Sequence, residues 1–152
     1  MMKNGVLHLI DSGGFYGAEA VILNLCLGLK ETDIKPVIGC FTITDNEKPE
    51  LGVMAEEKGI TVRYIPMRHK YDLRAVKYIY RIMDEEGIRI LHSHGYKPSF
   101  FILLLYALYK TPYIITSHLW TKDTLRYYLY ILLERFAMHY AQQVIAVSHP
   151  IA

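Results

Sequence analysis

A glycine-rich loop is the first stretch of this chain whose residue types suit ligand binding. It covers residues 11–19, follows a short apolar run, and carries Gly13, Gly14 and Gly17. Glycines let a ligand approach the backbone closely, and a helix beginning at Gly17 would offer free N–H groups and a partial positive charge to an anion. Glu19 falls in the first turn of that helix, where its charge suits the dipole. We therefore predict an anion-binding loop; the alternative is an ordinary tight turn.

The same loop differs from two well-known phosphate-binding motifs. Ser12 stands where the first glycine of a dinucleotide fingerprint would be, and the next predicted strand ends in Phe41-Thr42, without the acidic residue that holds a ribose. The chain also lacks the G-K-[ST] sequence of nucleoside triphosphatases. A nicotinamide cofactor and an NTPase activity are therefore not expected.

Histidines follow two further apolar runs. His92 and His94 form an H-x-H sequence, and His118 comes after the next run. On a strand, H-x-H points both rings to one face, as zinc ligands would be. Only His118 is available as a third ligand by sequence, and no acid or cysteine lies close by, so we expect no metal and interpret the histidines as hydrogen-bonding groups of a cleft. Ser148, after the last apolar run, is a weaker candidate site residue.

Apolar runs and helical stripes alternate along the chain. Strands are predicted at 6–10, 36–41, 61–65, 88–91, 112–116 and 144–147, and helices at 17–30, 50–58, 72–86, 97–110 and 124–141. Strands that read as continuous apolar runs are typical of a parallel sheet covered by helices on both faces. We predict a Rossmann-like, doubly wound α/β domain of about six mostly parallel strands in the order 3-2-1-4-5-6. In such sheets ligands bind at the carboxyl ends of the strands, where the glycine loop and the histidines would meet.

Composition excludes several classes of protein. The chain has 152 residues, which suits one domain, and 52% hydrophobic residues, which excludes a disordered chain. A net charge of +2 does not favour a nucleic-acid binder. The N-terminus lacks the pattern of a signal peptide, and the longest apolar run is too short to span a bilayer. We expect a cytoplasmic domain, and the end of the chain just after a strand suggests truncation of a longer protein.

The predicted helix at 124–141 carries more apolar side chains than one face needs. Its main stripe, expected to be buried, is Leu125, Tyr128, Leu129, Leu132, Phe136 and Tyr140, and Glu134-Arg135 is interpreted as an ordinary polar face. Tyr127, Tyr130 and Ile131 lie off that stripe, with Lys110, Lys122 and Arg126 nearby. Aromatic and basic side chains together suit a lipid interface, so peripheral membrane contact is one interpretation and burial against a neighbour the other.

Four segments taken in order resemble a known family. They are Gly13-Gly14 with Gly17-Ala18-Glu19, Ile90-Leu91-His92-Ser93-His94, Ile114-Ile115-Thr116-Ser117-His118, and Glu134-Arg135 through Val144-Ile145-Ala146-Val147-Ser148. Together they resemble the N-terminal domain of family 4 glycosyltransferases. The resemblance covers essentially the whole chain and implies half of a GT-B enzyme.

The resemblance implies two Rossmann-like domains facing across a cleft, with the acceptor received by this domain and the nucleotide sugar held by a C-terminal domain absent here. It implies transfer with retention of configuration, without a metal or other cofactor. Gly13, Gly14 and Gly17 would approach the donor diphosphate, His118 would act beside the transferred sugar, and His94 would line the cleft. The acceptor would be lipid-linked, a polysaccharide or a small molecule, and the isolated fragment would be inactive.

Two other functions remain open at this point. A sugar-nucleotide epimerase can share the GT-B fold, and its distinguishing acids would lie in the missing half. A non-catalytic α/β binding module of the receiver type is the second alternative. That class needs an aspartate at the tip of the third strand, where this chain has Pro66.

Overall fold

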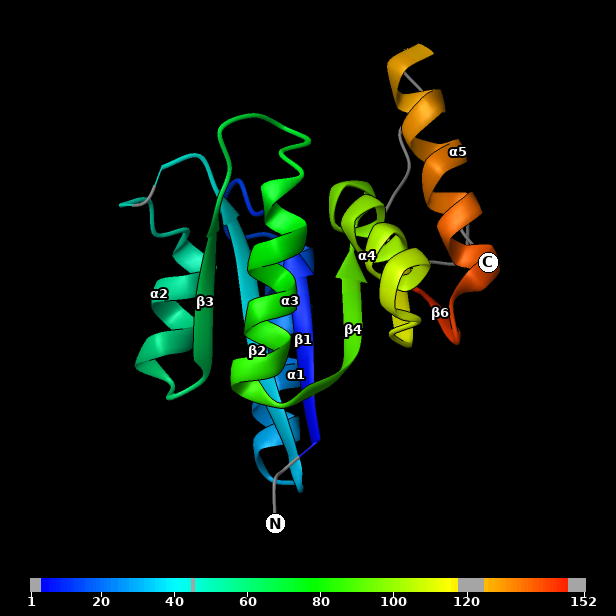
Figure 1. Ribbon diagram of the computed structural model, residues 1–152. Coiled ribbons are helices and arrows are strands. Elements are labelled where there is room, and N and C mark those ends of the chain that lie inside the picture. The colour runs from blue at the N-terminus through cyan, green and yellow to red at the C-terminus, as the bar shows by residue number, and fades with distance from the viewer. Residues whose placement is uncertain (1–3, 45, 118–124, 148–152) are drawn as a thin grey trace.

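The computed structural model describes residues 4–44, 46–117 and 125–147, and it alternates strands with helices as the sequence predicts (Figure 1). The strands are β1 (Asn4–Ile10), β2 (Ile34–Thr42), β3 (Thr61–Pro66), β4 (Ile88–His94), β5 (Tyr113–Ser117) and β6 (Gln143–Ala146). The helices are α1 (Gly17–Lys30), α2 (Glu50–Glu57), α3 (Arg74–Glu86), α4 (Tyr96–Tyr109) and α5 (Leu125–Tyr140). The boundaries agree closely with those expected, except that β4 continues through both histidines of the H-x-H sequence.

The six strands form one sheet in the order β3-β2-β1-β4-β5-β6, and every neighbouring pair is parallel. The predicted doubly wound topology is therefore confirmed. The direction of winding reverses between β1 and β4, so the carboxyl ends of these two strands flank the switch point. The last residues of the two strands, Ile10 and His94, lie opposite each other in register.

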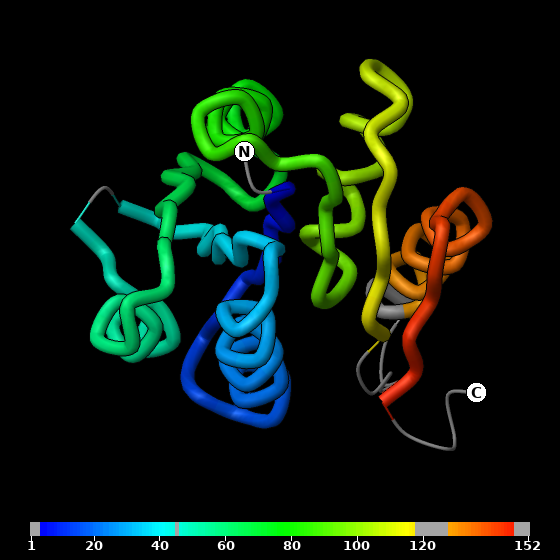
Figure 2. Tube along the Cα trace, turned by 90° about the horizontal axis from the view of Figure 1, so that it is seen from below, coloured from blue at the N-terminus to red at the C-terminus, as the bar shows by residue number. Residues whose placement is uncertain are grey.

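Helices cover the sheet from both sides. Leu7 and Leu9 of β1 face a core shared with α3 and α4, whereas Ile10 faces a second core shared with α1 and α2. This division follows from the period of two along a strand, which sends successive side chains to opposite faces. Figure 2 shows α1 and α2 on the opposite side of the sheet from α3. The two cores thus bury side chains from both faces of the sheet.

Helix α4 begins at the same edge of the sheet. Gly95, which precedes it, has φ of 99°, a conformation that L side chains rarely adopt. The Gly95 carbonyl accepts hydrogen bonds from the hydroxyls of Ser93 and Ser99, at 3.1 and 2.8 Å. These contacts fix the turn that leads from β4 into α4. Across the part of the chain that the structure describes, no helix has both the length and the apolar character needed to cross a membrane.

Helix α5 presents the opposite face from the one expected. Ile131, Glu134 and Ala137 are buried, and the hydroxyl of Tyr113 donates a hydrogen bond to the Ala137 carbonyl at 2.5 Å. The small Ala137 side chain lets the helix approach the sheet closely, and that contact decides which face turns inward. The expected buried stripe is wrong at the five of its residues whose side chains the structure describes, and Leu125 lies outside these. The polar interpretation of Glu134 is wrong as well. The exposed side, called here the α5 apolar face, consists of Tyr128, Leu129, Leu132, Phe136 and Tyr140.

Candidate functional site at the carboxyl edge of the sheet

The glycine loop after β1 folds around the carboxylate of Glu19. Glu19 is buried although its side chain is polar, and its oxygens accept hydrogen bonds from the Ser12 hydroxyl at 2.9 Å and from the Tyr16 amide at 3.0 Å. Ser12 also donates to the carbonyl of Gly14 at 2.8 Å. A buried carboxylate needs such donors, because an unpaired one would be strongly destabilising. Glu19 therefore does more than meet the helix dipole, since it holds the loop in its shape.

Two of the three candidate glycines face open space. A Cβ atom added at Gly13 or Gly17 would meet no other atom within 4 Å, and neither residue has the positive φ that would require glycine. At Gly14 an added Cβ would come within 2.6 Å of the Tyr16 ring, which is an exposed and adjustable side chain. Packing within the described residues thus gives no reason for glycine at 13 or 17. Close approach of a ligand to the backbone would give one.

A cavity of about 470 Å³ opens beside this loop at the ends of β1, β2 and β3. It is lined by Asp11, Ser12, Gly13, Phe41, Thr42, Ile43, Glu47, Met67, Arg68, His69, Lys70 and Lys97. Within it Lys97 forms an ion pair with Asp11 at 2.9 Å. The hydroxyl oxygen of Thr42 is buried and has no hydrogen-bond partner among the described residues. The cavity therefore combines charged groups of both signs with a polar atom that lacks a partner.

The loop after β3 supplies the basic side of this cavity. Arg68, His69 and Lys70 follow one another there and are exposed. Asp72 holds the loop: its carboxylate accepts the Arg68 amide at 2.9 Å and forms an ion pair with the Arg74 guanidinium. The hydrogen bonds from Arg74 and from the Arg68 amide hold the pKa of Asp72 well below its usual range.

Lys70 ties the same loop to two helices. Its ammonium lies 2.8 Å from the hydroxyl of Tyr130 on α5 and 4.0 Å from the centre of that ring. Tyr130 stacks in parallel on Tyr96 at the start of α4, with ring centres 4.5 Å apart. This arrangement of two stacked rings and a cation was not anticipated from the sequence, because its members lie far apart along the chain. It attaches the loop after β3, which lines the cavity, to α4 and α5.

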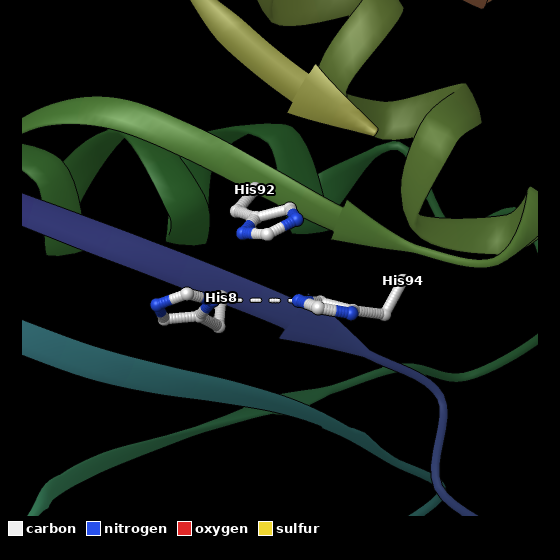
Figure 3. A group of neighbouring side chains, drawn as sticks. All are labelled: His8, His92 and His94. Carbon is white, nitrogen blue, oxygen red and sulfur yellow. Dashed lines mark hydrogen bonds between the residues drawn. The ribbon is translucent and has the colours of Figure 1, made fainter. Parts of the chain in front are cut away.

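The two histidines of β4 are buried on one face of the sheet, together with a third that the sequence analysis missed. His92 and His94 point the same way, as H-x-H on a strand predicts, and their ring centres are 4.2 Å apart. His8 of β1 lies beside them, with its Nδ1 at 3.3 Å from Nε2 of His94 (Figure 3). His8 pairs with His92 in the register of the two strands, a pairing that needs the sheet order to be known. Burial, together with the nearby His92, lowers the pKa of His8 to about 3, so its ring is neutral.

The structure describes most of the candidate site residues, but two of them lie outside the described part of the chain. It brings Gly13, Gly14, Gly17 and Glu19 to the same sheet edge as His94, whose ring turns inward against His8. His118 and Ser148 lie outside the described residues. Arg68 and Thr42, which the sequence analysis did not select, line the cavity. A basic run directly after a predicted strand was the signal that could have identified Arg68.

A comparison with protein families decides the affiliation of the chain. The model of Glycosyltransferase Family 4 matches residues 15–152. The chain belongs to this family. The family resemblance expected from the sequence is thereby confirmed. No curated protein matches the chain.

Solved structures share the fold at low identity. HepE from Anabaena in complex with UDP superimposes with a TM-score of 0.75 at 15% identity, covering 95% of this chain and 38% of HepE. MurG from Acinetobacter baumannii gives 0.68 at 12% identity, with 94% and 41% covered. The UDP-GlcNAc 2-epimerase from Methanocaldococcus jannaschii gives 0.62 at 12%, with 95% and 39% covered. The chain thus spans about two fifths of the length of these proteins, and one protein that shares its fold is an epimerase.

Proposed function

We propose that this chain is the acceptor-side domain of a retaining glycosyltransferase that uses a nucleotide-sugar donor. Family membership supports glycosyl transfer in general. The observation that carries the rest is the edge at the switch point, where open glycine positions lie next to a partly charged cavity. In this proposal a second domain, outside the present sequence, binds the donor and closes the cleft.

In this proposal the glycine loop meets the donor diphosphate. Gly13 and Gly17 leave room for a phosphate group, and the start of α1 offers N–H groups and a partial positive charge. Such preorganised donors stabilise negative charge that develops on a departing diphosphate. HepE has been solved with UDP and with UDP-glucose, which favours a sugar nucleotide as donor for a domain of the same fold.

The cavity receives the acceptor. Its polar groups suit a hydroxylated molecule, and the Thr42 hydroxyl would gain a partner from such a ligand. Arg68 forms no ion pair within the described part of the chain, so its guanidinium is available to an anionic group. We therefore favour an acceptor that carries both hydroxyls and a negative charge, as a lipid-linked or phosphorylated sugar does.

His118 is the proposed catalytic residue, placed beside the transferred sugar by the family resemblance alone. Its ring would hold a sugar hydroxyl or stabilise the positively charged sugar centre of the transition state. His94 would support the cleft from behind, because its ring is buried. Transfer in this proposal uses no metal ion: the diphosphate charge is met by backbone N–H groups and by the second domain.

Steady-state kinetics on the full-length protein test this proposal. The His118→Ala variant should lose about 100-fold or more in kcat, with a smaller change in the apparent affinity for donor. The 152-residue chain alone should transfer no sugar, because it lacks the groups that orient the donor. Wild-type kcat and KM in His118→Ala would refute the catalytic assignment, and turnover by the isolated chain would refute the two-domain mechanism. Conversion of the donor to its epimer without an acceptor would favour the epimerase alternative.

We also propose a cytoplasmic protein that touches the inner membrane surface through the α5 apolar face. The ammonium of Lys110, at the end of α4, lies over the ring of Tyr106, which in turn contacts Tyr140 of this face. The only carboxylate of α5, on Glu134, is buried. Aromatic and aliphatic side chains with basic neighbours and no exposed acid suit an anionic lipid surface. The full-length protein should float with vesicles containing phosphatidylglycerol, and the Leu129→Gln/Phe136→Gln variant should float less. Leu73→Gln, at an exposed apolar residue elsewhere, is the matched control; equal flotation of all three proteins would refute the contact.

A further inference from the structure

Three imidazoles gather on one face of two adjacent strands. His8 comes from β1, and His92 and His94 come from β4, so two segments far apart in sequence supply the group (Figure 3). All three side chains are buried, with exposed fractions of 1%, 3% and 4%. The cluster shares no residue with the lining of the cavity or with the glycine loop. Of its three members, only His94 also has a role in the proposed cleft, which it would support from behind.

The spacing of the ring nitrogens is close to that of a metal site. One nitrogen from each ring lies within 4.8 Å of one nitrogen from each of the others. The pair measured between Nδ1 of His8 and Nε2 of His94 is 3.3 Å apart. Zinc–nitrogen bonds of about 2.0–2.1 Å in a tetrahedral site place ligand nitrogens about 3.3–3.4 Å apart. The ring of His92 supplies the third nitrogen of this group.

The hydrogen bond made by His92 suits a metal-binding histidine. Its Nε2 lies 2.7 Å from the Thr116 hydroxyl, so Nδ1 is the nitrogen that would bind the metal. Metal-bound histidines commonly use their second nitrogen in this way. The Nε2 of His8 is buried and has no hydrogen-bond partner among the described residues, so hydrogen bonding there does not account for both nitrogens of this ring.

We propose that His8, His92 and His94 bind one divalent transition-metal ion that prefers imidazole, such as Zn²⁺. Three neutral imidazoles favour Zn²⁺, Ni²⁺ or Cu²⁺ over the oxygen-seeking Mg²⁺ and Ca²⁺. The fourth position is taken by a water molecule, whose loss of a proton would reduce the buried positive charge. The metal links β1 to β4 directly beneath the switch point. Its role is to stabilise the sheet there, and it takes no part in sugar transfer.

From the sequence alone, His118 was the only available third ligand, and no metal was expected. The strand register brings in His8, which no spacing along the chain would have indicated. The site stands or falls independently of the proposed transferase function, because its ligands and its test involve neither donor nor acceptor.

Metal titration of the chelator-treated, tag-free full-length protein tests the site. Adding ZnCl₂ should raise Tm, because an ion that binds only the folded state stabilises it, and about one Zn²⁺ should bind per protein molecule. MgCl₂ should not change Tm. CoCl₂ should give the strong visible absorption of tetrahedral Co²⁺. His8→Asn should weaken Zn²⁺ binding by about 100-fold or more, and Thr116→Val, which removes the partner of His92, by about 10-fold. His69→Gln, at an exposed histidine outside the cluster, should bind as wild type does.

Several results would overturn the proposal. Absence of a Zn²⁺-dependent rise in Tm would do so, and so would an equal rise in His8→Asn, since the chain has other histidines. Circular dichroism checks that each variant is folded. If His8→Asn does not fold, X-ray absorption on the wild-type Zn²⁺ complex decides: fewer than three imidazole ligands at the metal would refute the site.

Discussion

The loops that follow β1 and β3 each fold around one buried carboxylate, but they give it different partners. In the glycine loop, Glu19 accepts an uncharged hydroxyl and a backbone amide. In the basic loop, Asp72 accepts a backbone amide and also pairs with the guanidinium of Arg74. The first loop therefore presents backbone next to open glycine positions, whereas the second presents cationic side chains. In the proposed function, this sheet edge would therefore recognise anions in two ways, by N–H groups and by charge.

Loss of the Glu19 carboxylate should give the largest change in stability. Glu19→Ala leaves the Ser12 hydroxyl and the Tyr16 amide without their acceptor, and we expect the free energy of unfolding to fall by about 2–3 kcal/mol. Urea unfolding followed by circular dichroism measures this. Glu50→Ala, in the exposed first turn of α2, is the control and should change stability by less than about 0.5 kcal/mol. Equal effects of the two substitutions would show that Glu19 does not organise its loop.

Asp72→Asn should have a smaller effect that depends on pH and salt. The folded-state pKa of Asp72 lies below its ordinary value of 3.8, so its contribution is present above about pH 4 and is lost as the pH falls toward the folded-state pKa. At pH 7 we expect Tm to fall by about 2–4 °C. Below about pH 3 the difference from wild type should shrink, and high salt should reduce it as well, because Arg74 is partly exposed.

The glycine loop supplies the contrast for that experiment. Because the partners of Glu19 are uncharged, the effect of Glu19→Ala should change little with salt. Thermal unfolding of both variants at low and high ionic strength measures the difference. If the two effects fall in parallel with salt, the distinction between the loops is wrong.

Sequence predicted the fold well because local signals and the sheet agree. The apolar run at 6–10, the glycines after it and the helical stripe beginning at Gly17 each specify their own element. Parallel strands joined by helices leave few allowed topologies, so the order of the strands followed from general rules. The observed sheet has that order.

What the sequence missed depends on contacts between distant segments. His8 reads as one residue of a buried strand, and only the register of β1 against β4 brings it to His94. The orientation of α5 was predicted wrongly because the helix is apolar on several sides, and the contact between Tyr113 and Ala137 selects one of them. Burial of Glu19 was also missed, although its partner Ser12 is only seven residues away, because the contact depends on the shape of the loop.

Ser12→Ala should cost less stability than either carboxylate substitution. It removes one hydrogen bond to Glu19 and one to the Gly14 carbonyl from a partly exposed site, and we expect about 1 kcal/mol. Thr44→Ala, at an exposed threonine after β2, should be nearly neutral. Because Ser12 acts through Glu19, the Ser12→Ala/Glu19→Ala double variant should lose less than the sum of the single losses. Additive losses in urea unfolding would place the two residues in independent interactions.

Gly13→Val should change stability least and separate folding from ligand binding most clearly. Its Cβ would enter open space at a residue without positive φ, so the free energy of unfolding should stay within about 0.5 kcal/mol of wild type. In the full-length protein the same methyl groups would occupy the space proposed for the donor diphosphate. KM for the nucleotide sugar should therefore rise by about 10-fold or more, the effect of roughly 1.4 kcal/mol of lost binding.

The control for that variant is Gly28→Ala on α1, where an added Cβ also meets no other atom within 4 Å. It should stabilise the helix by about 0.5–1 kcal/mol and leave the kinetics unchanged, because it lies far along α1 from the loop.

A Gly13→Val protein that is folded and has wild-type KM would show that the donor does not bind against the glycine loop. In that case the basic loop alone, through Arg68 and its neighbours, would have to account for anion recognition at this edge. Arg68→Ala would then be the variant that raises KM, and the two kinds of recognition proposed for the sheet edge would reduce to one.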